Sequence, residues 1–245
     1  MRNVLILGAG GRIARRLTKL LADDSSVHLT LFARSRDRLG EVPEGVDVIE
    51  GDVLDKEALW EAVGGQEVVY AGLVGEVDKM AEAIVTTMTG RGVTRLIFTA
   101  ALGIHDEVPG EFGEWNREQL GGALEPYRKA VEEIAGSAID YTVLRPAWFI
   151  EGDEVDYAVT KRDEEFRGTV VTRQSVAALA AEIIRDPALY SREDLGVGKP
   201  GTEKVRPVFA AEKKDAEEKA GEQKAQEDRT APEGGTDPKG EAEKK

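Results

Sequence analysis

The stretch that decides the fold of this chain is Gly8-Ala9-Gly10-Gly11-Arg12-Ile13-Ala14. Residues 3–7, just before it, form a continuous apolar run, as expected of a strand that is buried on both faces of a parallel sheet. After it, apolar residues recur at helical spacing as far as Leu21, with basic residues on the other side. A strand, a glycine turn and a helix in this order predict a dinucleotide site. The alternative is an ordinary glycine-rich turn in an α/β protein.

The glycines of this turn have separate physical tasks. Gly8 allows a tight turn, and Gly10 and Gly11 let the backbone approach a pyrophosphate. The helix that follows directs its unpaired N–H groups and the positive end of its dipole at the phosphates. We therefore expect a cofactor to contact Gly8, Gly10, Gly11, Arg12 and Ile13.

Composition excludes several classes of function. The net charge of −14 leaves no basic surplus to neutralise phosphates, which argues against a nucleic-acid or anionic-membrane partner. The absence of cysteine excludes disulfides, thiol catalysis and cysteine-ligated metals, and we expect no metal site. No apolar stretch approaches the roughly 20 residues needed to span a bilayer, and the chain enters its first strand with no room for a signal peptide. We expect a soluble, cytoplasmic protein.

Further strands and helices alternate along the chain. Apolar runs predict strands at residues 27–33, 46–50, 67–71, 94–99 and 140–145, with short later strands at 155–160 and 169–172. Helical spacing is clearest over residues 77–88 and also marks residues 124–135. Asp55 is the expected N-cap of a helix over residues 56–63, and Ser175 that of a final helix.

The residue after the second predicted strand bears on the choice of cofactor. An NAD site usually has an acidic residue here for the ribose 2′-hydroxyl, whereas this chain has Ala33 and then Arg34. A guanidinium suits the 2′-phosphate of NADP, because it donates two charge-assisted hydrogen bonds in a fork. Arg12 is a second candidate for the same phosphate. NADP is therefore favoured over NAD; the other interpretation is that these arginines are simply solvated.

Ligands of such sheets lie beyond the carboxyl ends of the strands. Asp52 and Val53 follow the third predicted strand, and a carboxylate at Asp52 is placed to accept from an adenine amino group. Ala71 ends the fourth predicted strand, and Gly72 begins the loop after it. We add these four residues to the predicted cofactor site.

A long loop is predicted over residues 106–116, and such loops in compact domains are usually functional or disordered. Phe112 and Trp115 in it, together with Trp148, are candidates to line a substrate pocket, with ordinary packing as the alternative. His105, just before it, is a candidate catalytic residue, although a lone histidine is more often structural.

Residues 211–245 differ in composition, with Glu, Lys, Ala, Gly and Pro dominant. Such a segment buries too little apolar surface to offset its ordering entropy, which predicts a disordered tail. The alternative is a helical tail that contacts a protein partner.

Residues 3 to about 207 resemble the atypical short-chain dehydrogenase/reductase superfamily, and within it the NmrA-like NAD(P)-binding branch. The matching segments are the glycine loop, Arg34, Gly51-Asp52-Val53, Tyr127-Arg128-Lys129-Ala130-Val131-Glu132 and Asp140-Tyr141-Thr142-Val143-Leu144-Arg145-Pro146-Ala147-Trp148. The resemblance implies an α/β fold of Rossmann type: a doubly wound parallel sheet over residues 1–207, with a small substrate-side region mainly from residues 147–174.

The resemblance also implies catalytic roles. In this superfamily a serine after the fifth strand and a Tyr-x-x-x-Lys pair carry out proton transfer, and the lysine holds the nicotinamide ribose. Lys129 falls where the lysine belongs, but Glu125 stands four residues before it and Tyr127 only two. Thr99 is the nearest hydroxyl to the serine position. We take Tyr127, Lys129, Thr99 and His105 as the catalytic candidates.

Two functions remain open on these grounds. The first is an NADPH-dependent reductase of a small carbonyl or quinone-type compound. The second is a non-catalytic NADP(H) binder that acts as a redox sensor, which the missing serine and displaced tyrosine favour. An isomerase or epimerase with a retained cofactor is a third alternative.

Overall fold

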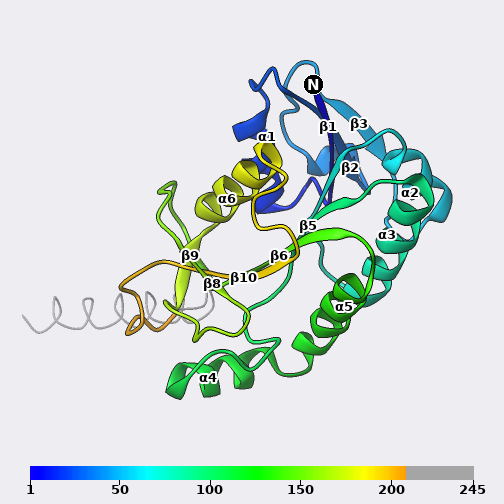
Figure 1. The fold of residues 1–245 in the computed structure, drawn as a ribbon. Helices are drawn as coiled ribbons and strands as arrows, with labels where there is room; N and C mark the ends of the chain where they lie inside the picture. The colour runs from blue at the N-terminus through cyan, green and yellow to red at the C-terminus, as the bar shows by residue number, and fades with distance from the viewer. Residues whose placement is uncertain (208–245) are drawn as a thin grey trace, which may run out of the picture. The chain divides into compact units, whose positions relative to one another are not determined.

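The computed structural model of the protein describes residues 1–207, so the predicted tail of residues 211–245 lies outside the described residues. An eight-stranded sheet has the strand order β3-β2-β1-β4-β5-β6-β10-β8 (Figure 1). Its strands are β1 Arg2–Leu7, β2 Val27–Ala33, β3 Asp47–Glu50, β4 Val68–Ala71, β5 Arg95–Thr99, β6 Asp140–Pro146, β8 Ala158–Lys161 and β10 Glu193–Gly198. All neighbours pair in parallel except β8 with β10. The predicted Rossmann-type sheet, wound outward in both directions from β1, is confirmed.

Helices cover both faces of the sheet. The helices are α1 Arg12–Leu21, α2 Lys56–Val63, α3 Val77–Arg91, α4 Gly110–Leu120, α5 Leu124–Gly136 and α6 Arg173–Arg185, with 3-10 turns η1 Arg36–Arg38 and η2 Gly121–Ala123. On one face α1 packs beside α6, and on the other α3 packs against α2 and α5 (Figure 1). No helix within residues 1–207 is long and apolar enough to cross a membrane.

The first strand shows why the chain needs an unbroken apolar run there. Side chains of a strand alternate between the two faces of a sheet. Val4 and Ile6 pack in the layer of α1 and α6, whereas Leu5 and Leu7 pack in the layer of α2, α3 and α5. All four are fully buried, because both faces of β1 are covered.

The chain after β6, which includes the predicted substrate-side residues 147–174, adds four more strands. Strands β7 Trp148–Ile150 and β9 Val170–Thr172 form a separate two-stranded parallel sheet, and β8 and β10 extend the main sheet. Neither β7 nor β10 is predicted from the sequence. The sequence of β10 has only two apolar residues, Leu195 and Val197, among two acids and two glycines, which is a weak strand signal, so its pairing with β6 and β8 makes it a strand.

The predicted long loop is wrong in its second half, where the chain forms α4. The glycines at positions 110 and 113 weaken the helical signal. Gly113 nevertheless suits its place, since a Cβ atom there would lie 2.0 Å from the carbonyl oxygen of Val108. Trp115 and Asn116 are the buried side of this helix, so tertiary packing outweighs its weak local propensity.

Two predicted helix caps have different outcomes. Asp55 is confirmed as the N-cap of α2, and its side chain accepts from the N–H groups of Glu57 and Ala58 at 3.1 Å each. Ser175 is not the cap of α6. The helix begins two residues earlier, and the Thr172 hydroxyl accepts from the N–H of Ser175 at 3.0 Å.

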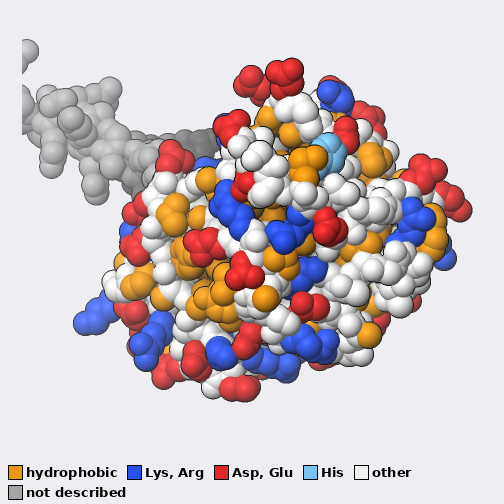
Figure 2. Space-filling model, turned by 45° about the horizontal axis from the view of Figure 1, so that its top comes forward, with side chains coloured by type: hydrophobic (Ala, Val, Ile, Leu, Met, Phe, Trp, Pro, Cys, Tyr) orange, Lys and Arg blue, Asp and Glu red, His pale blue; other side chains and the backbone are white. Residues whose placement is uncertain are grey.

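Acidic and basic side chains are mixed over the face shown in Figure 2, with hydrophobic side chains between them. The net charge of −14 is therefore not gathered into one continuous acidic patch on this face.

Candidate functional site

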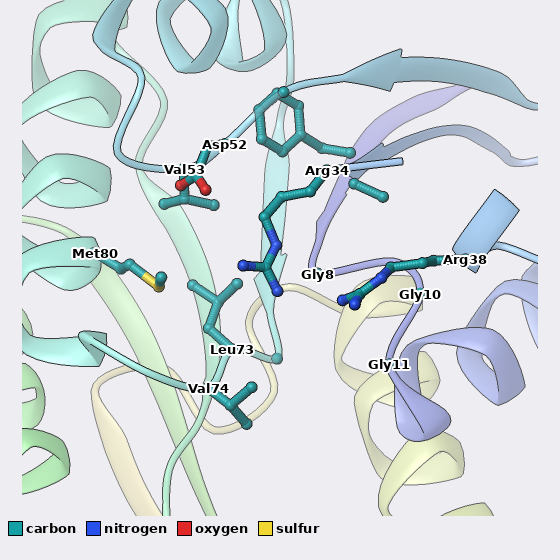
Figure 3. Close-up of a pocket in the computed structure, with 14 residues that line it drawn as sticks. Gly8, Gly10, Gly11, Arg34, Arg38, Asp52, Val53, Leu73, Val74 and Met80 are labelled. Carbon is teal, nitrogen blue, oxygen red and sulfur yellow. The ribbon is translucent and has the colours of Figure 1, made fainter. Parts of the chain in front are cut away.

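A cavity of about 220 Å³ opens beside the glycine loop, at the carboxyl ends of β1, β2, β3 and β4 (Figure 3). This is the crevice in which doubly wound sheets bind ligands. Its lining comes from the glycine loop, η1 and the loops after β2, β3 and β4. The lining residues are Gly8, Gly10, Gly11, Phe32, Ala33, Arg34, Arg38, Gly51, Asp52, Val53, Gly72, Leu73, Val74 and Met80.

The glycine loop is closed in on two sides, and side chains would not fit there. Gly8 has a φ of +74°, and a Cβ atom on it would lie 2.4 Å from the carbonyl oxygen of Gly72. A Cβ atom on Gly10 would lie 3.0 Å from the Cβ of Arg38. The loop therefore presents bare backbone to the cavity, as an approaching phosphate requires.

The helix that starts at this loop has no side-chain cap. Gly11 is the N-cap of α1, and no side chain accepts from the first N–H groups of the helix. The N-termini of α2 and α6, by contrast, are capped by Asp55 and Thr172. The N-terminus of α1 thus keeps its donors available to an anion.

Two guanidinium groups converge on the cavity. Arg34 follows β2, and Arg38 ends η1; the side chains of both extend into the space in front of Gly8 and Gly10 (Figure 3). Arg34 is a predicted residue of this site, whereas Arg38 is not predicted. Arg38 reaches the cavity because the turn η1 brings it back against Gly10, and the sequence pattern does not indicate this turn.

The opposite wall of the cavity is apolar, with one carboxylate at its edge. Val53, Leu73, Val74 and Met80 supply the apolar surface (Figure 3). The Asp52 carboxylate accepts from the backbone N–H of Leu54 at 2.9 Å, which holds it in place. Met80 of α3 is partly buried against the core layer of α2, α3 and α5, and it also lines the cavity.

These features fit a nicotinamide dinucleotide cofactor. Backbone N–H groups and bare glycines suit a diphosphate, and paired guanidiniums suit a phosphate monoester. An apolar wall with an acceptor at its edge suits an adenine ring and its amino group. The residues on all three sides are therefore appropriate for such a cofactor.

Four residues of the predicted cofactor site lie outside the cavity lining: Arg12, Ile13, Ala71 and Lys129, the last of which is described below with Tyr127. Arg12 forms an ion pair with Glu151 and does not line the cavity with Arg34, the other arginine predicted for the 2′-phosphate. Ile13 is partly buried against the core layer of α1 and α6. Ala71 is fully buried within β4, and the cavity is lined by Gly72 after it.

Thr99 is held in the core beneath the site. Its hydroxyl lies 3.0 Å from that of Tyr70, which is fully buried. Desolvation raises the pKa of Tyr70 to about 12, against a smaller lowering by the bond to Thr99. Thr99 is the last residue of β5, and neither Thr99 nor Tyr70 is among the residues that line the cavity.

Tyr127 and Lys129 point to different places. The Tyr127 hydroxyl donates to the carbonyl oxygen of Leu73 at 3.1 Å, which puts the phenol next to a residue of the cavity wall. Burial raises the pKa of Tyr127. Lys129 is exposed, lies 3.7 Å from the Glu125 carboxylate and lines a separate surface hollow with Glu132 and Glu133. The structure does not bring Lys129 to the cofactor cavity.

His105 belongs to a buried ionic network and does not line the cofactor cavity. Its Nε2 lies 2.7 Å from Oδ2 of Asp194, whose Oδ1 accepts from Nε of Arg145 at 2.5 Å. Arg145 is fully buried and also pairs with Glu107. Burial would raise the pKa of Asp194, but the bonds and charges of His105 and Arg145 outweigh it and leave that pKa lowered. The network joins the segment after β5 to β6 and β10.

The aromatic residues predicted to line a substrate pocket pack against one another. The ring of Trp115 lies 5.7 Å from that of Phe112 and 5.1 Å from that of Trp148. The indole N–H of Trp148 donates to the side-chain oxygen of Asn116 at 2.8 Å. These contacts fasten α4 to β7. Within residues 1–207 no group of His, Asp and Glu could hold a metal ion.

Comparison with known proteins gives a consistent result. A family model described as NAD(P)H-binding matches residues 8–187. The chain is 41% identical to a Rossmann-fold NAD(P)-binding family protein from Shigella flexneri, with a TM-score of 0.75 over 85% of this chain and 99% of that one. It is 29% identical to a short-chain dehydrogenase/reductase from Veillonella parvula solved in complex with NADP, with a TM-score of 0.77 and the same coverage.

A curated relative is an enzyme. An NAD(P)H azoreductase from Xenophilus azovorans is 21% identical over 195 residues, which is 75% of this chain. The chain spans only 64% of the length of that relative. Fold, cavity and family match agree: the chain belongs to the NAD(P)H-binding family, among the atypical short-chain dehydrogenase/reductase-like proteins.

Proposed function

We propose that the protein binds NADPH and reduces a small carbonyl or quinone-type compound, and that it belongs to the NmrA-like branch of its family. The observation that carries the cofactor preference is the pair of guanidiniums, Arg34 and Arg38, in one cavity with the glycine loop. The NADP complex of the Veillonella parvula relative supports it. The azoreductase relative supports a reductase as the class of enzyme.

Each wall of the cavity has a task in this proposal. Arg34 and Arg38 bind the 2′-phosphate, the glycine loop and the start of α1 bind the diphosphate, and Asp52 accepts from the adenine amino group. When bound, the cofactor supplies a hydride to the substrate. Binding by charge and backbone geometry leaves specificity for the substrate to the region after β6.

Tyr127 is the proton donor in this proposal. Its phenol lies beside Leu73 at the cavity wall, and burial raises its pKa. The raised pKa makes the phenol a weaker acid, because general acids work best with a pKa near the working pH, so the assignment rests on the position of the phenol beside Leu73. The proton goes from the Tyr127 oxygen to the carbonyl oxygen of the substrate.

Cofactor preference is tested by calorimetric titration of NADPH and NADH. Replacing Arg34 or Arg38 by alanine removes hydrogen bonds to a charged group, each contributing about 1.5–3 kcal/mol. NADPH affinity should therefore fall by roughly 10- to 150-fold in each variant, with little change for NADH. Arg117→Ala, at an exposed arginine of α4 outside this cavity, is the control. Equal weakening of both nucleotides would contradict the NADP assignment.

A non-catalytic redox sensor is the second candidate. It is favoured by the position of Lys129, which is turned to Glu125, and of Thr99, which is bonded to Tyr70. The two candidates are distinguished by following NADPH absorbance at 340 nm with a panel of quinones and carbonyls. Tight NADPH binding without turnover of any of them would favour the sensor.

A further inference from the structure

Two arginines from separate helices hold one carboxylate next to the glycine loop. Arg12 is the first residue of α1, and Arg173 is the first residue of α6. Both donate to the same oxygen of Glu151, Oε1, with the Arg173 Nη1 atom at 3.1 Å. Glu151 directly follows β7, within residues 147–174, which the family resemblance predicts to be the substrate side.

Positive charge is in excess at this point. The bond from Arg12 lowers the pKa of Glu151, and the charges of Arg173 and Arg16 act in the same direction. Burial and then the charge of Arg12 lower the pKa of Arg173. Three guanidiniums therefore act on one carboxylate, in a protein whose net charge is −14.

The arginine at the centre of this group is fixed, whereas the carboxylate is exposed. The Arg173 side chain is 15% exposed, and its guanidinium carbon lies 4.5 Å from the centre of the Phe149 ring. The Glu151 side chain is 67% exposed, and residues 151–156 are all exposed and without helix or strand. A carboxylate on an exposed segment is easily displaced, because an exposed ion pair contributes only about 0–1 kcal/mol.

We propose that Arg173 and Arg12 form a binding site for a carboxylate of the substrate, and that Glu151 occupies this site in the free protein. The inference rests on the proposed reductase function and names its substrate class: a carbonyl or quinone-type compound that bears a carboxylate. Arg173 supplies a planar fork that matches a carboxylate. Phe149, partly exposed beside it, supplies an apolar surface for the body of the substrate.

The test is calorimetric titration with benzoate and its neutral analogue benzamide, into the protein alone and saturated with NADPH. Benzoate should bind at millimolar concentration, and benzamide at least about tenfold more weakly, since a difference of 1.4 kcal/mol corresponds to a factor of ten. Arg173→Gln should remove this preference, and Glu151→Gln should strengthen benzoate binding because it removes the competing carboxylate. Arg162→Gln, at an exposed arginine of the loop after β8, should change neither.

Other results would overturn the inference. Equal binding of benzoate and benzamide, or no binding of either, excludes a carboxylate site. If Arg173→Gln weakens NADPH as much as benzoate, the arginines serve the cofactor diphosphate. Arg173→Lys keeps the charge without the planar fork and should retain part of the preference, which separates loss of the site from loss of folding. Absence of NADPH binding would count against the proposed function, whereas the titration without NADPH still tests the carboxylate site.

Discussion

The carbonyl oxygen of Gly72 lies 2.4 Å from the position that a Cβ atom on Gly8 would occupy. The loop after β4 therefore lies in close contact with the turn after β1. Gly8 also has a φ of +74°, which residues with a side chain rarely adopt. Both the contact and the dihedral angle require glycine, and they place the bare loop at the mouth of the cofactor cavity.

Gly8→Ala should therefore destabilise the protein and abolish NADPH binding. The positive φ alone costs on the order of 1–3 kcal/mol, and the contact with Gly72 displaces one of the two loops. Gly45→Ala is a matched control, since Gly45 has a φ of +79° but nothing within 4 Å of the added atom. Thermal melting and NADPH titration should show a larger loss for Gly8→Ala. Equal losses would mean that the contact with Gly72 is unimportant.

Tyr127→Phe should reduce turnover by roughly 10²- to 10⁴-fold, the usual contribution of a positioned general acid. NADPH affinity should stay close to that of the wild type, because the phenol contacts the backbone of Leu73 and not the arginines. Tyr141→Phe is the control for loss of a phenol, because Tyr141 lies near the start of β6, away from the carboxyl ends of the strands where the cavity opens. Unchanged steady-state turnover in Tyr127→Phe would remove Tyr127 as the proton donor.

His105→Ala should lower stability and leave NADPH binding intact. The imidazole bonds to the buried Asp194 carboxylate at 2.7 Å, and loss of one partner of a buried polar group costs about 1–3 kcal/mol. Denaturant unfolding measures this cost, and turnover per folded molecule measures catalysis. A loss of turnover in stable, NADPH-bound protein would restore His105 as a catalytic residue.

Because of Asp194, the free energy of unfolding should decrease as the pH is lowered into the acid range. Its pKa is lowered in the folded protein, below the value near 3.9 of an unfolded aspartate. Its contribution to the free energy of unfolding is therefore present above pH about 4 and is lost as the pH falls through the folded pKa. Unfolding curves recorded between neutral and acid pH measure this slope.

Asp194→Asn should flatten that slope and destabilise the protein at neutral pH. Removing one partner of a buried ion pair costs about 3–5 kcal/mol, here because Arg145 keeps only Glu107 as a charged partner. Asp163→Asn, at an exposed aspartate, should leave both the slope and the neutral-pH stability as they are. An Asp194→Asn protein with the wild-type acid slope would show that other carboxylates govern it.

The sequence predicted the sheet and half of the site because these depend on local requirements. An apolar run, a glycine turn and a helical repeat follow one another within the first twenty residues, and each is readable without knowledge of its neighbours. Arg34, Asp52 and Gly72 were found for the same reason, since each lies within two residues of the end of a predicted strand and the carboxyl ends of parallel strands share one edge.

What only the tertiary structure decided concerns residues whose role depends on distant partners. Arg38 reaches the cavity through the turn η1, Met80 faces it from α3, and Tyr127 meets Leu73 from α5. The spacing of apolar residues in the sequence does not predict these contacts between distant elements.

The charged pairs show the same division. His105 bonds to Asp194, which lies 89 residues later in the chain, and Arg12 bonds to Glu151, 139 residues later. The sequence by itself determined that the chain winds a parallel sheet around a phosphate-binding turn, because local propensity and backbone geometry suffice for that. Which side chains face the cavity and which pair with one another was decided by packing between elements far apart in the chain, since a side chain takes the partner that the folded core brings to it.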